Sequence, residues 1–165
     1  IAKGWGVDQI FEYMRDAGMK NFMVEIGGEV RTLGKNNKGS HWKIGIDKPM
    51  IGTVPGEEIY SVVSVSNQAM ATSGNYRNFQ EYNNVKYSHI IDPRTGQPTQ
   101  SNITSVTVIA PNCMDADALA TALNVMDVKE GKALVESLDG IEAFWITKEK
   151  GHVRSVATSG MPIDN

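Results

Sequence analysis

Apolar residues near the beginning of the chain recur with the spacing of an amphipathic helix. The stripe, with members at i, i+3, i+4 and i+7, consists of Val7, Ile10, Phe11 and Met14. Gly18 follows this stripe and is typical of a helix C-terminal stop. Asp8 lies near the predicted start, so we expect its carboxylate to interact favourably with the dipole of this helix.

Shorter apolar stretches along the middle of the chain predict strands. We expect strands at residues 21–26, 29–34, 41–47, 59–65, 69–73, 79–82, 85–89 and 105–110. The polar stretch 35–40 predicts a hairpin loop between the second and third of these strands. Residues 67–68 join the fourth strand to the fifth, and Asn83-Asn84 favours a tight hairpin turn because asparagine tolerates positive φ.

Helical spacing returns towards the end of the chain. Residues 115–126 carry a predicted apolar stripe of Leu119, Ala122, Leu123 and Met126, and a second helix is expected at residues 129–138. Residues 141–147 and 152–157 predict a closing hairpin. The order helix, strands, two helices, two strands indicates an α+β fold with a mainly antiparallel sheet and flanking helices.

Composition and charge exclude several classes of protein. A hydrophobic share of 41% with 21% charged residues is ordinary for a globular domain. The net charge of −3 gives no basic surface for nucleic acid, so no nucleic-acid partner is expected. The apolar runs are too short to cross a bilayer, and one cysteine with three separated histidines does not favour a closed zinc site. Because the chain begins at Ile1 rather than methionine, we expect it to be a portion of a longer protein.

Asp117 and Thr121 are the first candidate site. Four positions apart on a predicted helix, a carboxylate and a hydroxyl project from one face. Two hard oxygen ligands, completed by substrate phosphates and water, suit Mg²⁺. The alternative is that Asp115 and Asp117 cap the helix and the polar face is solvated; the spacing alone favours this simpler interpretation.

His89 is the second candidate, in the segment Ser88-His89-Ile90-Ile91-Asp92-Pro93-Arg94-Thr95-Gly96. A histidine between a strand and a turn can accept a proton from an attacking hydroxyl. Asp92 or Arg94 would then orient it or bind a phosphate. The alternative is a surface histidine beside an Asp92–Arg94 ion pair, and the residues alone favour it.

Glycine-rich turns form the third candidate. Gly27-Gly28 and the segment containing Thr72, Ser73, Gly74 and Arg77 would let backbone N–H groups approach a pyrophosphate, with an arginine as charge partner. Neither dinucleotide-binding nor P-loop glycine spacing is present in the sequence. Glycines between strands are more often only turns.

Seven segments, taken in order, together resemble the FAD:protein FMN transferase family, also called ApbE or the thiamine-biosynthesis lipoprotein family. The similarity covers almost the whole chain. The segments are residues 1–8 (IAKGWGVD), 25–31 (EIGGEVR), 42–46 (WKIGI), 72–78 (TSGNYRN), 88–96 (SHIIDPRTG), 105–111 (SVTVIAP) and 115–122 (DADALATA). The resemblance implies an ApbE-like, T-fold-related architecture in which residues 1–165 form the C-terminal portion of a single flavin-transferase domain.

The same resemblance implies roles for individual residues. Asp117 and Thr121 would be Mg²⁺ ligands, His89 a catalytic residue, and Lys3 and Ile91 contacts to FAD, alongside the Thr72, Ser73, Gly74 and Arg77 segment. Asn75 stands where the family often has an aspartate.

The implied reaction is Mg²⁺-dependent transfer of FMN from FAD, the substrate, to a Ser or Thr of an acceptor flavoprotein, with release of AMP. Implied partners are acceptor subunits of membrane redox complexes and a missing N-terminal half of the same protein. The implied location is the periplasmic side of the bacterial inner membrane, with a lipid anchor in the full-length protein. Two alternatives stay open: a Mg²⁺-dependent FAD pyrophosphatase and a non-catalytic FAD-binding module.

Overall fold

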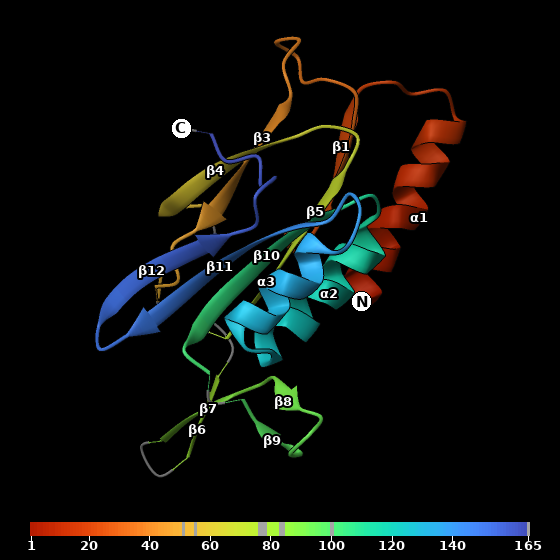
Figure 1. Cartoon of the computed structure of the whole chain (residues 1–165). Helices are drawn as coiled ribbons and strands as arrows, with labels where there is room; N and C mark the ends of the chain where they lie inside the picture. Colours follow the sequence, from red (N-terminus) through yellow and green to blue (C-terminus); the bar gives the residue numbers. More distant parts are fainter. Residues whose placement is uncertain (51, 55, 76–78, 83–84, 100, 165) are drawn as a thin grey trace.

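Six strands form the central sheet of the protein, seen in a computed structural model that describes residues 1–165 except 51, 55, 76–78, 83–84, 100 and 165 (Figure 1). Each strand is antiparallel to its neighbours. Their order across the sheet is β1 (Phe22–Ile26), β2 (Glu29–Leu33), β5 (Ala69–Gly74), β10 (Ile103–Ala110), β11 (Glu142–Glu149) and β12 (His152–Ala157). The predicted α+β fold with a mainly antiparallel sheet is confirmed.

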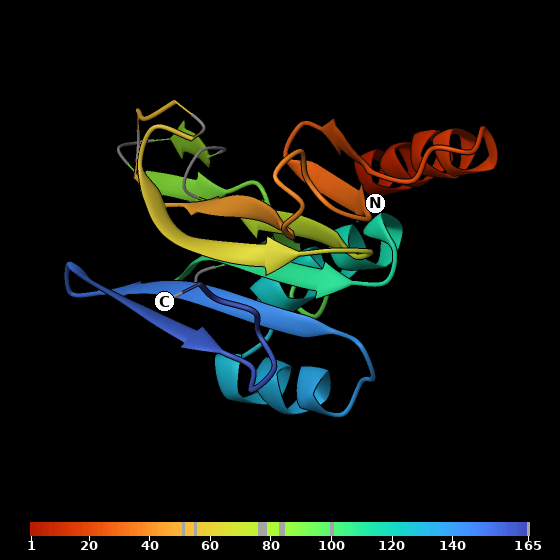
Figure 2. The same cartoon turned by 90° about the horizontal axis from the view of Figure 1, so that it is seen from above.

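Both faces of the central strands are buried, which gives the molecule three layers (Figure 2). Trp145 on β11 faces the helices α2 (Cys113–Val125) and α3 (Val128–Glu136), while its neighbour Phe144 faces the opposite layer. This follows from the strand period of two, because successive side chains point to opposite faces. The helix α1 (Ala2–Asp16) packs on β1 and β2 and against α2.

The opposite layer is a two-stranded sheet of β3 (Trp42–Asp47) and β4 (Ile59–Val65). Ile46, Val63 and Val65 bury their side chains against the central sheet. The predicted hairpin between the second and third strands is therefore wrong: β3 pairs with β4, because β5 takes the open edge of β2 through the pair Val30–Met70. The chain passes from β4 back to the central sheet at Asn67, whose φ of 57° fits the predicted connection.

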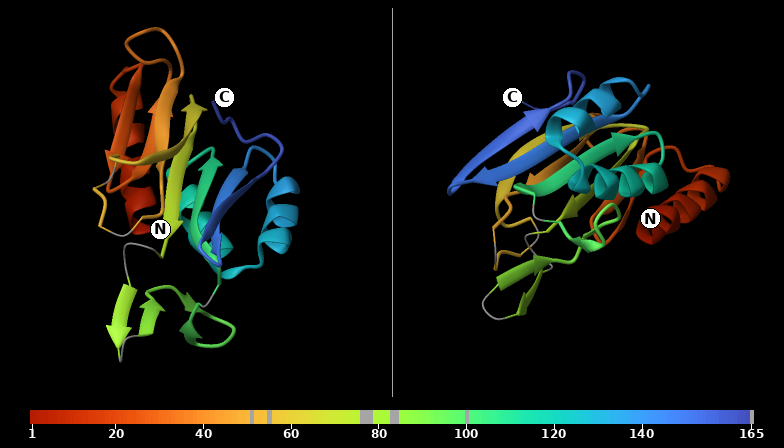
Figure 3. Two further views of the ribbon diagram at one scale, coloured as in Figure 1. Left: turned by 90° about the vertical axis from the view of Figure 1, so that its left-hand side faces the viewer. Right: turned by 60° about the horizontal axis from the view of Figure 1, so that its bottom comes forward.

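Two small hairpins extend beyond the end of the central sheet at which β5 ends and β10 begins (Figure 3). One pairs β6 (Phe79–Tyr82) with β7 (Val85–Ser88), as predicted, although its Asn83-Asn84 turn lies outside the described residues. The other pairs β8 (Ile91–Asp92) with β9 (Gln97–Pro98). Arg94 in the second turn donates to the main-chain oxygen of Val125 at 2.7 Å, which ties this hairpin to the C-terminal end of α2.

The predicted role of Asp8 is wrong, and one residue of the predicted apolar stripe at 115–126 is wrong. Asp8 lies in the second turn of α1 and binds backbone N–H groups of α2 rather than the end of its own helix. The predicted apolar stripe is wrong for Ala122, which is exposed, whereas Leu123 is buried and the half-buried Leu119 and Met126 pack against the core. The buried face of α2 also carries small residues such as Ala116 and Ala120, because α2 lies between the sheet and α1 and must approach both closely.

Among the described residues, no helix combines the length and apolar character needed to span a membrane.

Candidate functional site

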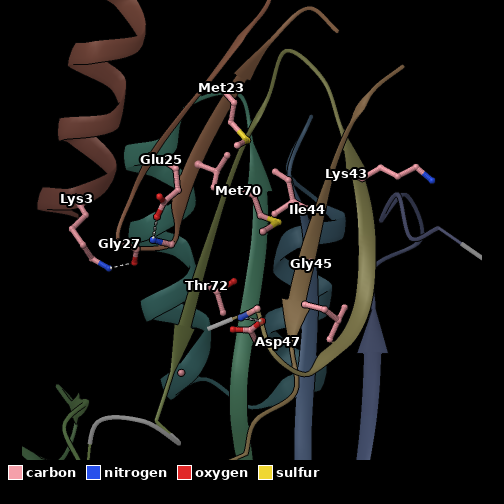
Figure 4. A pocket seen from close by; sticks show the side chains of 15 residues that line it. Lys3, Met23, Glu25, Gly27, Lys43, Ile44, Gly45, Asp47, Met70 and Thr72 are labelled. Carbon is pink, nitrogen blue, oxygen red and sulfur yellow. Dashed lines mark hydrogen bonds between the residues drawn. The ribbon is translucent and has the colours of Figure 1, made fainter. Parts of the chain in front are cut away.

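A cavity of about 710 Å³ lies between the β1–β2–β5 part of the central sheet and the β3–β4 layer (Figure 4). Its wall is largely apolar, with Met23, Ile44 and Met70 among the side chains that face it. Its lining carries both charges, positive at Lys3 and Lys43 and negative at Glu25 and Asp47. The volume and lining suit a medium-sized ligand with an apolar part and a polar or charged part.

The turn between β1 and β2 brings glycine backbone to this cavity. Gly27 and Gly28 have φ values of 58° and 99°, which glycine adopts at little cost. The carboxylate of Glu25 accepts a hydrogen bond from Gly28 N at 2.7 Å and fixes the turn. Lys3 reaches across from α1 and donates to the oxygen of Gly27 at 3.2 Å (Figure 4). The predicted glycine-rich turn and the predicted FAD contact Lys3 therefore lie together.

Glu29 holds Lys3 in this position. Its carboxylate oxygens lie 2.6 and 2.7 Å from Lys3 Nζ, and Glu29 is only 3% exposed. Burial raises the pKa of the Glu29 carboxyl above its ordinary value, the Lys3 ammonium opposes that rise, and the nearby negative charge of Asp117 adds to it. The carboxylates of Glu29 and Asp117 thus lie near each other, and the Lys3 ammonium pairs with the first of them.

Asp117 lies at the crossing of α1 and α2. It is 8% exposed, and its Oδ2 accepts a hydrogen bond from Gly4 N at 3.0 Å. The predicted alternative of a solvated polar face is thus wrong for Asp117, whereas Asp115 and Thr121 on the same helix are exposed. Asp117 also interacts electrostatically with Glu29, the partner of Lys3, so its carboxylate lies near the Lys3 end of the cavity without being part of the lining.

Thr121 follows Asp117 by one turn on α2. Its Oγ1 donates a hydrogen bond to the main-chain oxygen of Asp117 at 3.1 Å. This bond uses the hydroxyl proton, so the lone pairs of the oxygen stay available to accept a hydrogen bond or to bind a metal ion. Among the described residues, no cluster of three or more His, Cys, Asp or Glu side chains could hold a metal ion. The donor set here is thus one carboxylate and one hydroxyl, which fits Mg²⁺ because Mg²⁺ takes few protein ligands and completes its shell with phosphate oxygens and water.

The end of β5 supplies the third part of the site. Thr72 and Gly74 line the cavity, while the main-chain oxygen of Ser73 accepts a hydrogen bond from the buried amide of Asn124 on α2 at 3.1 Å. The hydroxyls of Thr72 and Thr107 lie 2.8 Å apart. These bonds fix the backbone of β5 against its neighbours. Arg77, the predicted charge partner of this segment, lies outside the described residues.

Asn75 anchors the chain where β5 ends. Its side-chain amide donates to the oxygen of Ile103 at 2.9 Å, and its backbone N–H donates to Thr104 at 3.1 Å. An ionised aspartate at this position could not donate the first of these bonds. In this chain Asn75 therefore holds the end of β5 to the start of β10.

Replacing Asn75 with Asp is expected to lower the free energy of unfolding by about 1 kcal/mol, because a carboxylate would face the Ile103 carbonyl oxygen in place of a donor. Urea denaturation monitored by circular dichroism measures the change. Asn102→Asp is the matched control: it adds the same charge nearby, on an exposed residue whose main-chain oxygen accepts a hydrogen bond from Lys148 N. Equal effects of the two substitutions would contradict this role of Asn75.

His89 and Ile91 lie outside the cavity lining, around the short connection from β7 to β8. Both are exposed, Ile91 to 50%. Asp92 and Arg94 pair with each other, and the guanidinium lowers the pKa of the Asp92 carboxyl. Because Arg94 also binds Val125, the segment that carries His89 is tied to the same helix as Asp117 and Thr121.

Cys113 is buried, and burial raises the pKa of its thiol to about 12, so it has the character of a packing residue rather than a nucleophile.

Comparison with known proteins decides the family. A family model described as the ApbE family matches residues 1–145, most of the chain. The chain belongs to the ApbE family. It is 44% identical over 159 residues to the FAD:protein FMN transferase of Vibrio cholerae, covering 96% of this chain and 46% of that protein. The corresponding protein of Haemophilus influenzae is 47% identical over 135 residues, covering 81% of this chain and 38% of that protein.

Solved structures of the ApbE family agree with the fold. The flavin transferase ApbE from Vibrio cholerae superposes with a TM-score of 0.81 at 43% identity, covering 96% of this chain and 49% of that one. The apo form of the Pseudomonas stutzeri flavinyl transferase ApbE gives a TM-score of 0.80 at 34% identity, covering 96% and 48%. The chain thus spans about half the length of the relatives it matches, and the predicted family and architecture are confirmed.

Reasoning from the sequence did not predict the roles of three residues at the site. These roles depend on contacts between elements that are distant in the chain, and the residues are Asp8, Glu29 and Asn124. The sequence could have indicated Glu29, because an acid directly follows two glycines at the start of a strand. It could also have indicated Asn124, because an amide follows Leu123 on a helix whose buried face is mainly apolar.

Proposed function

We propose that this chain carries the metal ligands and part of the flavin site of a Mg²⁺-dependent transferase, which moves FMN from FAD to a Ser or Thr of an acceptor flavoprotein and releases AMP. The observation that supports the proposal is the bond from Gly4 to the Asp117 carboxylate, because Gly4 is the neighbour in sequence of Lys3, which lines the cavity. The names of the relatives as FAD:protein FMN transferases support the reaction class.

Asp117 and Thr121 would hold the Mg²⁺, which would neutralise charge on the FAD pyrophosphate as the bond to AMP breaks. Lys3, fixed by Glu29 and Gly27, would add a positive charge next to the phosphates. The apolar wall around Ile44 and Met70 offers a surface for the flavin ring. The backbone at Thr72, Ser73 and Gly74 would border the ligand at the other end of the cavity.

The acceptor hydroxyl would enter from the side of His89. Its oxygen forms a bond to the FMN phosphorus, its proton passes to His89, and the phosphoanhydride bond to AMP breaks. An exposed histidine suits this role, because a second protein must reach it. Ile91 follows on the same segment and would contact the flavin as the acceptor docks.

Replacing His89 with Ala is expected to slow FMN transfer by about 100-fold while leaving FAD binding within a factor of two. Proton acceptance contributes to the reaction step rather than to substrate binding, so kcat falls more than KM changes. Single-turnover transfer and FAD fluorescence titration measure the two quantities. An unchanged transfer rate would remove His89 from the mechanism.

The reaction itself is tested with the protein in its full natural length, FAD, Mg²⁺ and an apo-flavoprotein subunit with a candidate Ser or Thr. The expected result is a gain of FMN mass on the acceptor together with an equal amount of AMP. AMP and free FMN without labelling would indicate a pyrophosphatase, and tight FAD binding without AMP would indicate a binding module. A periplasmic, lipid-anchored location and membrane redox subunits as acceptors are further proposals, supported by the family resemblance alone.

A further inference from the structure

Asp8 makes contacts that its position in α1 does not require. The residue is only 9% exposed, and its two carboxylate oxygens accept hydrogen bonds from Cys113 N and Met114 N, each at 2.9 Å. Arg31 on β2 lies 2.9 Å from the same carboxylate and stacks over the ring of Phe11 at 4.0 Å. A buried acid is thus held by a cation and pointed at another helix.

The two N–H groups that Asp8 binds are those that the local cap of α2 leaves unpaired. Asn112 is the N-cap residue, and its side chain accepts the N–H of Asp115 at 2.9 Å. The N–H groups of a first helical turn have no partner within the helix. Asp8 therefore completes the N-terminus of α2 from a distance of more than 100 residues along the chain.

Asp117 makes the reciprocal contact. It accepts the N–H of Gly4 in the first turn of α1, so each helix carries an acid that caps the start of the other. Gly4 and Asp8 are four residues apart on α1, and Cys113 and Asp117 are four residues apart on α2, so the two bonds lie one turn from each other. The crossing of the helices is thereby fixed at two points.

We propose that Asp8 is a positioning residue for Asp117: by binding the start of α2 to α1, it sets the place of the Asp117 carboxylate beside the cavity and so supports cation binding. The inference rests on the proposed function, in which Asp117 and Thr121 hold the metal. Asp8 does not touch the cation itself, because its oxygens are occupied by Cys113, Met114 and Arg31.

The test is the affinity for Mn²⁺, a probe for Mg²⁺, measured by electron paramagnetic resonance on the protein in its full natural length, with and without FAD. Asp8→Asn keeps the size of the side chain but replaces one acceptor oxygen by an NH₂ group. We expect it to weaken Mn²⁺ binding about tenfold, the lower end of what loss of an outer-shell partner costs. Asn112→Ala is the matched control, because it weakens the same helix terminus without touching the link to α1.

The inference is supported if Asp8→Asn weakens Mn²⁺ binding while Asn112→Ala, at a similar shift of the urea midpoint, leaves affinity within twofold. It is overturned if the two variants affect affinity equally, or if Asp8→Asn changes nothing. If Asp8→Asn does not fold, Met114→Pro removes one of the two N–H groups at a first-turn position that tolerates proline, and unchanged affinity there is the overturning result. Absence of Mn²⁺ binding in the unsubstituted protein, or full binding by Asp117→Ala, would instead overturn the metal assignment and this inference with it.

Discussion

Asp117→Ala is expected to lower kcat/KM for Mg²⁺-dependent FMN transfer by about 100-fold or more. The substitution removes the one carboxylate of the proposed donor pair, and Thr121 alone would leave a neutral hydroxyl to hold a doubly charged ion. A 100-fold loss corresponds to about 2.7 kcal/mol of transition-state stabilisation, which is within the contribution of a bound metal to phosphoryl-type transfer. Transfer rates over a range of Mg²⁺ concentrations measure the effect.

Two further variants separate the metal role from the structural role of this residue. Asp115→Ala removes the same charge two residues away on an exposed position of α2 and is expected to keep most of the activity. Asp117→Asn keeps an oxygen that can accept the Gly4 N–H, so it should preserve the helix crossing and still lose metal-dependent turnover. Full Mg²⁺-dependent turnover by Asp117→Asn or Asp117→Ala would refute the metal assignment.

Local patterns in the sequence predicted most elements of the fold, because each element is defined by neighbours along the chain. The strands at residues 59–65, 79–82 and 152–157 are found with the predicted bounds. Pairing was harder to predict, since it depends on which edges remain open. The loop at 35–40 looks like a hairpin locally, but β5 already takes the edge of β2 that such a hairpin would use.

At the site too, local features could be predicted from the sequence and contacts between distant elements could not. The four-residue spacing of Asp117 and Thr121 and the glycines at 27 and 28 are visible in the sequence. The sequence does not show that Asp117 lies near the glycine turn, because this depends on Gly4, whose N–H donates to the carboxylate of a residue 113 positions later. The predicted α2 stripe was incomplete for a related reason. Helix α1 covers a second side of α2, where alanines and an acid are buried, and the periodicity of α2 does not encode the presence of α1.

Gly4→Ala is expected to destabilise the protein by about 2 kcal/mol and to weaken metal binding at the same time. A Cβ at this position would clash with the main-chain oxygen of Cys113 and lie 2.9 Å from Cβ of Asp117. Backbone cannot yield as a flexible side chain can, so α1 and α2 must move apart, and overpacking of this kind costs about 1–3 kcal/mol even after the helix propensity of alanine is counted. Urea denaturation gives the stability and Mn²⁺ titration the affinity.

Gly6→Ala provides the control on the same helix. The nearest atom to its added Cβ would be Cδ1 of Ile26 at 3.5 Å, an ordinary contact, so the substitution should be neutral or stabilise by up to about 1 kcal/mol through helix propensity. If both alanines were tolerated, α1 would not lie as close to α2 as the Gly4–Asp117 bond requires. The cavity and the acid–alcohol pair would then no longer be held together, and the basis for a single flavin and metal site would be lost.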